Sequence, residues 1–327
     1  MKQFLLCDML LVLLLLLAGC TSIASMPIRT LENVSLPASS DTSIVTEDVP
    51  AALYFRYWDE PYLACEWRFI SRTRSQSYEQ ALLEELLSGP SARSTELTGM
   101  FPVGSRILSA VRQGRTLFVT FSSEIMNSYP DEPIDWQEYE YWLTEAPLRR
   151  RLCMQSIVAT ITENCDVDQV QILVEQTGSV TGSLRLRQNY FLDDSEDDIL
   201  VGPMQRDDNV LLNCEQAMHH FFALTLSQDW EKLYRCIPDN DALTAVEKPS
   251  YSDFVAQMKD LPTLTSYSLS VPTMSLDGQE AIIQVNGSAT LPSLRRVALP
   301  SRIFRMTRQD GLWKVSLSQL REWMEVE

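Results

Sequence analysis

The fold of the first half of the chain is decided by residues 77–90, which read SYEQALLEELLSGP. Ser77 can accept a hydrogen bond from the backbone, and Gln80 can reach back to it, which is the pattern of a capping box. The segment closes with Gly89-Pro90, a left-handed cap followed by a stop. The apolar side chains in between have helical spacing: Tyr78, Leu82, Leu83, Leu86 and Leu87. We therefore predict a short helix that ends at Ser88.

Two hairpins are expected around this helix. Residues 53–58 and 64–70 are rich in aromatic and apolar strand formers and are separated by Asp59-Glu60-Pro61. Residues 106–111 and 117–121 flank a turn with a central glycine, and Leu117, Val119 and Phe121 alternate on one face.

The rest of the first half contains one irregular stretch and two regular elements. Residues 129–147 combine prolines, acids and aromatic residues and are interpreted as an insertion or long loop. Residues 149–164 carry apolar side chains at helical spacing, and Val170, Ile172 and Val174 alternate as a strand. This order predicts a small α+β sandwich with helices on one face of a sheet.

The second half begins near Asp208 and changes from a helical period to a period of two. Three helical stripes are followed by about four antiparallel strands, and Asp310-Gly311 is a strong hairpin signal. The helices are expected at Leu211–Phe222, Trp230–Ile237 and Ser250–Leu261, and the strands at Tyr267–Val271, Ala281–Val285, Arg302–Thr307 and Leu312–Leu317. An α+β domain is therefore predicted for residues 208–327.

The N-terminus contains Leu17-Ala18-Gly19-Cys20 after an apolar run, Met9 to Leu17, that is too short to span a membrane. It resembles a bacterial lipobox. The resemblance implies a signal peptide over 1–19, cleavage before Cys20, acylation of Cys20 and an extracytoplasmic, membrane-anchored protein. An ordinary signal peptide or a stray apolar N-terminus is the alternative. Residues 20–50 are rich in Ser, Thr and Pro and are expected to form a disordered tether.

The formal net charge of -17 excludes two classes of partner. A field of this sign repels phosphate backbones and anionic headgroups, so neither nucleic-acid binding nor basic adhesion to a membrane is expected. The densest acidic run, residues 193–198, lies in a predicted linker over 179–207. A calcium loop is the weaker alternative, because the run lacks the glycine turn and distal glutamate of an EF-hand.

Five cysteines remain after Cys7 and Cys20 are set aside: Cys65, Cys153, Cys165, Cys214 and Cys236. Their spacing fits no metal pattern, so no metal is expected. Cys214 and Cys236 fall on successive predicted helices and could form a bridge. We expect small buried hydrophobic side chains instead.

Several pieces of the first half resemble the GerMN domain of sporulation and spore-germination lipoproteins. In order along the chain they are residues 53–55, 81–90, 101–105, 157–163 and 167–174, within a domain placed at 51–178. The chain departs from the pattern by its insertion at 129–147 and by Thr120 in place of an acid. The resemblance implies an envelope lipoprotein that works by protein contact, and it brings no catalytic residues.

The second half is similar in pattern to the cone-shaped nuclear-transport-factor-2-like, or ketosteroid-isomerase-like, domains. The similarity rests on the order of helices and strands and on the closing residues 311–315. Such folds enclose an apolar pocket that serves enzymes, ligand binders or dimers, so the fold leaves the function open.

One pair of side chains is a candidate for catalysis. His219 and His220 are the two histidines, and adjacent helical positions project about 100° apart. One of them near Asp207, Asp208 or Glu215 could act as a general base. We favour the alternative, a surface or cavity-lining histidine that has no catalytic role. No serine-hydrolase, nucleotide or dinucleotide motif occurs. We therefore expect no enzyme and no cofactor, with an isomerase-like or ligand-binding second half as the alternative.

An aromatic cluster is the strongest signal for recognition. Trp136, Tyr139, Tyr141 and Trp142 alternate with acids within residues 135–145. Aromatic anchors are enriched in protein interfaces and also suit sugars. These rings could instead fold back on their own domain. The leading hypothesis is a non-enzymatic assembly module that contacts envelope or sporulation proteins. Peptidoglycan binding through Trp136 and Trp142 is the alternative.

Overall fold

The computed structural model describes residues 46–176, 182–192, 199–241 and 246–325. These residues belong to one compact unit of the α+β class, as the sequence predicts. It contains two hydrophobic cores. One is built from residues 46–212, called the N-terminal half, together with Leu312, and the other from residues 213–325, called the C-terminal half. None of the helices within the described ranges is long and apolar enough to cross a membrane. The predicted signal peptide, Cys20 and the acidic run 193–198 lie outside these ranges.

The first sheet is built on the predicted hairpin. Strand β1 (Thr46–Tyr57) pairs antiparallel with β2 (Leu63–Thr73) and carries the short β3 (Leu97–Thr98) on its other side. The prediction of the hairpin is correct, but β1 begins earlier than expected. The predicted tether extends to Pro50, but residues 46–50 are strand instead, because they pair with residues 69–73.

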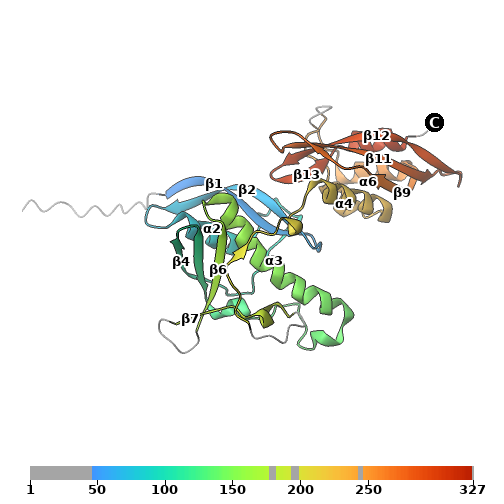
Figure 1. The fold of residues 1–327 in the computed structure, drawn as a ribbon. Coiled ribbons are helices and arrows are strands. Elements are labelled where there is room, and N and C mark those ends of the chain that lie inside the picture. The colour runs from blue at the N-terminus through green and yellow to red at the C-terminus, as the bar shows by residue number, and fades with distance from the viewer. Residues whose placement is uncertain (1–45, 177–181, 193–198, 242–245, 326–327) are drawn as a thin grey trace, which may run out of the picture. The chain divides into compact units, whose positions relative to one another are not determined.

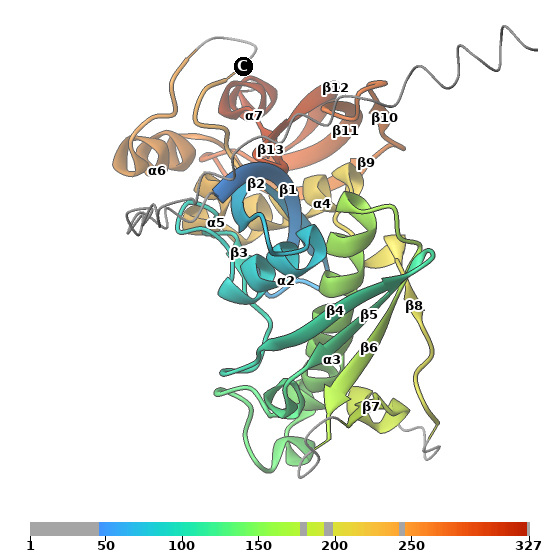
Figure 2. The same cartoon turned by 90° about the vertical axis from the view of Figure 1, so that its left-hand side faces the viewer.

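The second sheet contains the other predicted hairpin, β4 (Ile107–Gln113) and β5 (Thr116–Phe121), with β6 (Gln169–Glu175) parallel to β5. Two short strands, β7 (Ser183–Arg185) and β8 (Met204–Gln205), pair with β6. The prediction of a linker over 179–207 is therefore wrong at these strands, which complete the sheet. The expected single sheet is two sheets, and α2 and α3 contact both (Figures 1 and 2).

Helix α2 (Tyr78–Ser88) has the predicted limits. The Ser77 hydroxyl accepts from the backbone N–H of Gln80 at 3.1 Å, but the Gln80 side chain donates to Glu84 instead of reaching back. Only half of the predicted capping box therefore forms. Gly89 has a φ of +90°, a conformation that glycine adopts easily.

Helix α3 (Glu140–Asn164) begins well before the expected Arg149. It follows two short 3-10 turns, η1 (Ser123–Met126) and η2 (Trp136–Glu138). The prediction of a loop over 129–147 is wrong from Glu140 onward. The sequence does not reveal the extra turns, because several acids and Pro147, which lies inside the helix, interrupt the apolar spacing. Glu145, Ala146 and Leu148 nevertheless face the rest of the protein.

The C-terminal part of α3 covers the open edge of β1 (Figure 1). The hydroxyl of Ser156 donates to the carbonyl of Tyr54 at 2.6 Å, and the hydroxyl of Thr160 accepts from the Tyr54 N–H at 3.1 Å. The Asn164 amide bonds both the carbonyl and the N–H of Ala52, at 2.8 and 2.9 Å. These polar residues stand four apart on one face, so the helix satisfies backbone groups that a further strand would otherwise pair.

The C-terminal half has the predicted three helices and four main strands. Its elements are η4 (Asp208–Val210) just before it, α4 (Cys214–Ser227), α5 (Trp230–Arg235), α6 (Tyr251–Asp260), β9 (Thr263–Leu269), β10 (Thr273–Met274), β11 (Glu280–Thr290), β12 (Arg296–Gln309), β13 (Leu312–Val315) and α7 (Leu317–Met324). The strands form one antiparallel sheet in the order β10-β11-β12-β13, with β9 beside β11. The turn at Asp310-Gly311 forms as predicted, with positive φ at both residues.

Helix α7 was missed, because the strand predicted to reach Leu317 ends at Val315. Its side chain Trp323 is fully buried and meets Phe222 and Phe304 edge to face, with ring centroids 5.5 and 5.6 Å apart. Gly287 makes room for this ring, since an added Cβ there would lie 2.7 Å from it. Aromatic packing therefore fills the interior of the C-terminal half.

Candidate functional site

The most exposed apolar feature of the predicted aromatic cluster is the segment around the start of α3. Residues 134–143 are called the α3 tip here. Tyr139 and Tyr141 are 49 and 57% exposed, Leu143 is 50% exposed, and Ile134 is fully exposed. In Figure 1 this end of α3 lies away from β1. Large apolar side chains at this exposure usually indicate a contact surface when they occur together.

The two tryptophans of the cluster behave differently from the tyrosines. Trp136 and Trp142 are half-buried. The Arg149 guanidinium lies 4.9 Å from the ring centroid of Trp142, and Tyr141 meets that ring edge to face at 5.3 Å. The alternative that the rings fold back on their own domain thus describes Trp142, whereas the tyrosines face solvent.

A buried ion pair joins the base of the α3 tip to β1. Arg56, which is 3% exposed, binds Glu145 through two N–H···O contacts of 2.5 and 3.1 Å. Arg149 bridges Glu145 at 2.5 Å to Asp131 at 2.7 Å. Burial alone would raise the pKa of Glu145, but hydrogen bonds from Arg56 and Arg149 outweigh it, so the pKa lies below its usual value. Both carboxylates are therefore held in their charged form.

A second buried ion pair holds the loop that precedes the tip. Arg150 binds Glu132 through contacts of 3.1 and 3.2 Å, and both side chains are buried. The Arg150 guanidinium also lies within 6.0 Å of the ring centroids of Tyr129 and Tyr190. The α3 tip is thus held on both sides, by Glu132 before it and by Glu145 after it. The prediction of a loop did not include these ion pairs.

The histidines diverge, as adjacent helical positions should. His219 is exposed, with its Nδ1 3.4 Å from the Tyr267 hydroxyl. His220 is mostly covered and places Nδ1 3.2 Å from a carboxylate oxygen of Glu60. The hydrogen bond to His220 lowers the pKa of Glu60. Neither histidine meets the predicted acids. Glu60 was not foreseen, because it lies far away in the sequence, in the turn between β1 and β2.

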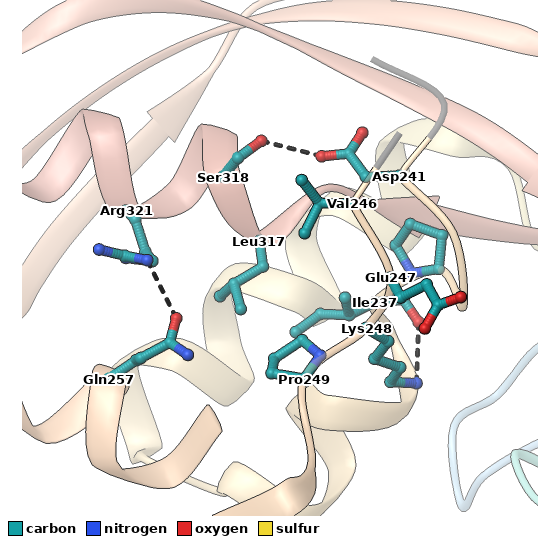
Figure 3. A pocket seen from close by; sticks show the side chains of 11 residues that line it. Ile237, Asp241, Val246, Glu247, Lys248, Pro249, Gln257, Leu317, Ser318 and Arg321 are labelled. Atoms are coloured by element: carbon teal, nitrogen blue, oxygen red, sulfur yellow. Dashed lines mark hydrogen bonds between the residues drawn. The ribbon is translucent and has the colours of Figure 1, made fainter. Parts of the chain in front are cut away.

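A pocket of about 290 Å³ lies in the C-terminal half, between the segment that follows α5 and helices α6 and α7 (Figure 3). Apolar side chains surround it: Ile237, Val246, Pro249 and Leu317. Its polar rim is tied together by Arg321 with Gln257 at 3.0 Å and by Ser318 with Asp241 at 2.9 Å. Among the described residues that line it there is no histidine, so the predicted general base does not face this pocket.

The cysteines follow the simpler prediction. All five within the described ranges are free thiols, so Cys214 and Cys236 form no bridge. Cys65, Cys153, Cys214 and Cys236 are buried, as expected for small hydrophobic side chains, and Cys165 is half-buried. Burial raises the pKa of Cys65 and of Cys153 to about 12, so neither is a reactive thiolate at neutral pH.

The comparison with protein families identifies one segment of the chain. Residues 52–178 match the Germane family, described as sporulation and spore germination. Residues 52–178 carry a GerMN domain. The α3 tip lies within the matched residues of the GerMN domain, whereas β7 and β8 follow them. No curated protein matches the chain.

Solved structures similar to the chain include the tandem GerMN domains of the sporulation protein GerM from Bacillus subtilis, at 18% identity over 51% of this chain and 47% of that one, with a TM-score of 0.32. The first GerMN domain of the same protein matches at 17% identity over 39% and 83%, with a TM-score of 0.28. The chain thus spans about half of the tandem structure.

A ketosteroid isomerase from Mycobacterium sp. is similar at 15% identity over 30% of this chain and 85% of that one, with a TM-score of 0.24. The order of elements in the C-terminal half, helices followed by an antiparallel sheet, agrees with the nuclear-transport-factor-2-like pattern that the sequence predicts.

Proposed function

We propose that the protein is a non-enzymatic, lipid-anchored extracytoplasmic module that assembles with other envelope proteins during sporulation or spore germination. The observation that carries this proposal is the α3 tip, an exposed apolar segment on a base of buried ion pairs. The GerMN domain supports the biological setting. The resemblance of residues 17–20 to a lipobox supports the anchor.

The two buried ion pairs beneath the tip favour a role in docking over a surface loop that has no function. A buried arginine–carboxylate pair contributes little net stability compared with apolar packing, but it fixes geometry when both partners are present. Here two such pairs hold a segment that leaves Tyr139 and Tyr141 in solvent. Rigid tyrosines that lose little entropy on binding are frequent hot spots of protein interfaces.

The predicted anchor places the module at the membrane surface. Residues 21–45 separate Cys20 from the start of β1 at Thr46. Partners of the tip are therefore expected at the same membrane surface.

A complementation experiment tests the proposal. A spore-forming host lacking this gene receives the full chain, the variant Tyr139→Ser/Tyr141→Ser, or the control Val271→Ser/Leu276→Ser, which alters two exposed apolar residues of the C-terminal half. We expect the tip variant to lose spore formation or germination while remaining folded and present in membranes, and the control to restore both. Full function of the tip variant would contradict docking through the tip.

Two further measurements separate the alternatives. Cys20→Ser should release the protein from the membrane fraction if Cys20 carries the lipid. Binding of the full chain to purified cell wall, abolished by Trp136→Ala/Trp142→Ala and retained by the tyrosine variant, would favour peptidoglycan recognition instead.

A second candidate function is binding of a small apolar ligand in the pocket of Figure 3, favoured by its apolar walls and its volume of about 290 Å³. Leu317→Trp would fill this pocket. Unchanged function of a folded Leu317→Trp variant in the same host would argue against a required ligand there.

A further inference from the structure

We infer that the partner of the α3 tip is a protein surface with an apolar recess ringed by lysine or arginine side chains. This inference rests on the proposed function and adds the chemical class of the partner. It starts from the charge of residues 131–145, which contain six acids and neither lysine nor arginine. A negatively charged segment beside exposed tyrosines selects its partners by charge as well as by shape.

The structure separates these acids into two groups. Asp131, Glu132 and Glu145 are neutralised from within the protein by the three arginines of the ion pairs described above. The other acids, Asp135, Glu138 and Glu140, are exposed. Within the part of the chain that the structure describes, no salt bridge reaches them. Their negative charge is therefore presented to the solvent around Tyr139 and Tyr141.

The same charges argue against other classes of partner. Nucleic acids, anionic lipid headgroups and phosphate-rich cell-wall polymers are repelled by the tip and by the net charge of -17. An uncharged sugar could stack on a tyrosine, but it would gain nothing from three neighbouring carboxylates. A basic protein surface satisfies both features at once, since its apolar recess covers the rings and its cations face the acids.

The two features should affect binding in different ways. Charges at the rim of an interface mainly speed association and make it depend on salt, whereas buried aromatic anchors slow dissociation. Neutralising Glu138 and Glu140 should therefore lower the association rate at low salt, with little change in the dissociation rate. Replacing Tyr139 and Tyr141 should instead accelerate dissociation.

Photo-crosslinking in intact cells tests this inference with the full, membrane-anchored chain. Tyr141 is replaced by p-benzoylphenylalanine, and Leu276, a fully exposed residue in the C-terminal half, carries the same probe as a control site. We expect a protein adduct specific to the Tyr141 site whose crosslinked segment has a net positive charge. A neutral or acidic crosslinked segment, or a glycan adduct, would overturn the inference about the partner. No site-specific adduct at all would overturn the proposed docking function as well.

Charge variants of equal net change provide the matched control. Glu138→Gln/Glu140→Gln alters the tip, and Glu215→Gln/Asp260→Asn alters two acids on α4 and α6 that have no salt bridge in the described residues. The tip pair should lower the crosslinking yield at least about fivefold at low salt, and the control pair should leave it within about twofold. Equal effects of both pairs would show that only the overall charge matters and would overturn the inference, while a tyrosine-dependent adduct would leave the proposed function intact.

Discussion

The two ends of α3 are attached to β1 by different chemistry. Near the N-terminal end, Glu145 binds Arg56 in a buried ion pair. Near the C-terminal end, the uncharged side chains of Thr160 and Asn164 bond the backbone of Tyr54 and Ala52. Both attachments are buried or nearly so, but only the first one depends on charge.

This difference separates two tasks of one helix. The neutral stripe replaces a missing strand neighbour, so it protects the edge of β1 and contributes to stability. The ion pairs contribute less than apolar packing would, yet they fix the direction in which the helix enters. The α3 tip lies just before Glu145 in the chain. We therefore interpret the ion pairs at this end of α3 as the interactions that position the tip as a contact surface.

Breaking the charged attachment should have the largest effect. Arg56→Met leaves the buried Glu145 with Arg149 as its remaining partner. It also removes the hydrogen bonds that Arg56 donates to the carbonyls of Asp59 and Glu60, so the free energy of unfolding should fall by about 3–5 kcal/mol. Urea denaturation measures this loss. Arg72→Met, which removes an exposed pair with Glu47, is the control and should cost less than about 1 kcal/mol. Similar losses in both variants would show that the buried pair has no special role.

Breaking the neutral attachment should have a smaller effect. Thr160→Val keeps the shape of the side chain but leaves the buried N–H of Tyr54 without its partner, at a cost of about 1–3 kcal/mol. Thr162→Val is the matched control, because the Thr162 hydroxyl bonds only within α3 and its loss should cost less than about 0.5 kcal/mol. Denaturant midpoints of the two variants compare them directly, and a harmless Thr160→Val would mean that α3 does not serve as a neighbour of β1.

The comparison also explains what the sequence could predict. Both hairpins of the first half and the Asp310-Gly311 turn depend on local patterns, and they form as expected. The start of α3 cannot be predicted in the same way, because acids and Pro147 interrupt the apolar spacing that indicates a helix. The roles of Thr160 and Glu60 depend on contacts between residues that are distant in the chain, and no local signal encodes them.

The sequence identifies the residues of the candidate site, but it does not predict which of their side chains face solvent. The sequence singles out the aromatic cluster at 136–142, because aromatic anchors are enriched in protein interfaces and their faces also suit sugars. Which rings face solvent depends on Arg149, whose side chain covers Trp142 and leaves Tyr141 outside. Which rings are exposed therefore depends on the position of the ion pairs in the tertiary structure.

Acid should separate the two attachments. The pKa values of Glu145 and Asp131 are lowered in the fold, for Asp131 by its hydrogen bond with Arg149. Both carboxylates therefore stabilise the fold above their unfolded pKa values of about 4, and this contribution is lost as the pH falls through the folded values. We expect the free energy of unfolding to fall below about pH 4 in the wild type and in Thr160→Val with the same slope. Arg56→Met/Glu145→Met should show a shallower slope, and an unchanged slope would contradict this assignment.

The smallest effect on stability is expected at the α3 tip itself. Tyr139 and Tyr141 are about half exposed, so Tyr139→Ser/Tyr141→Ser should change the free energy of unfolding by less than about 1 kcal/mol, as surface substitutions do. Thermal unfolding of the full chain measures this, with Val271→Ser/Leu276→Ser as the exposed control. A loss as large as that of Thr160→Val would mean that the tyrosines support the fold, and their exposure could then no longer be attributed to docking. A small loss combined with lost function in the host would assign the tyrosines to contact and the arginines beneath them to positioning.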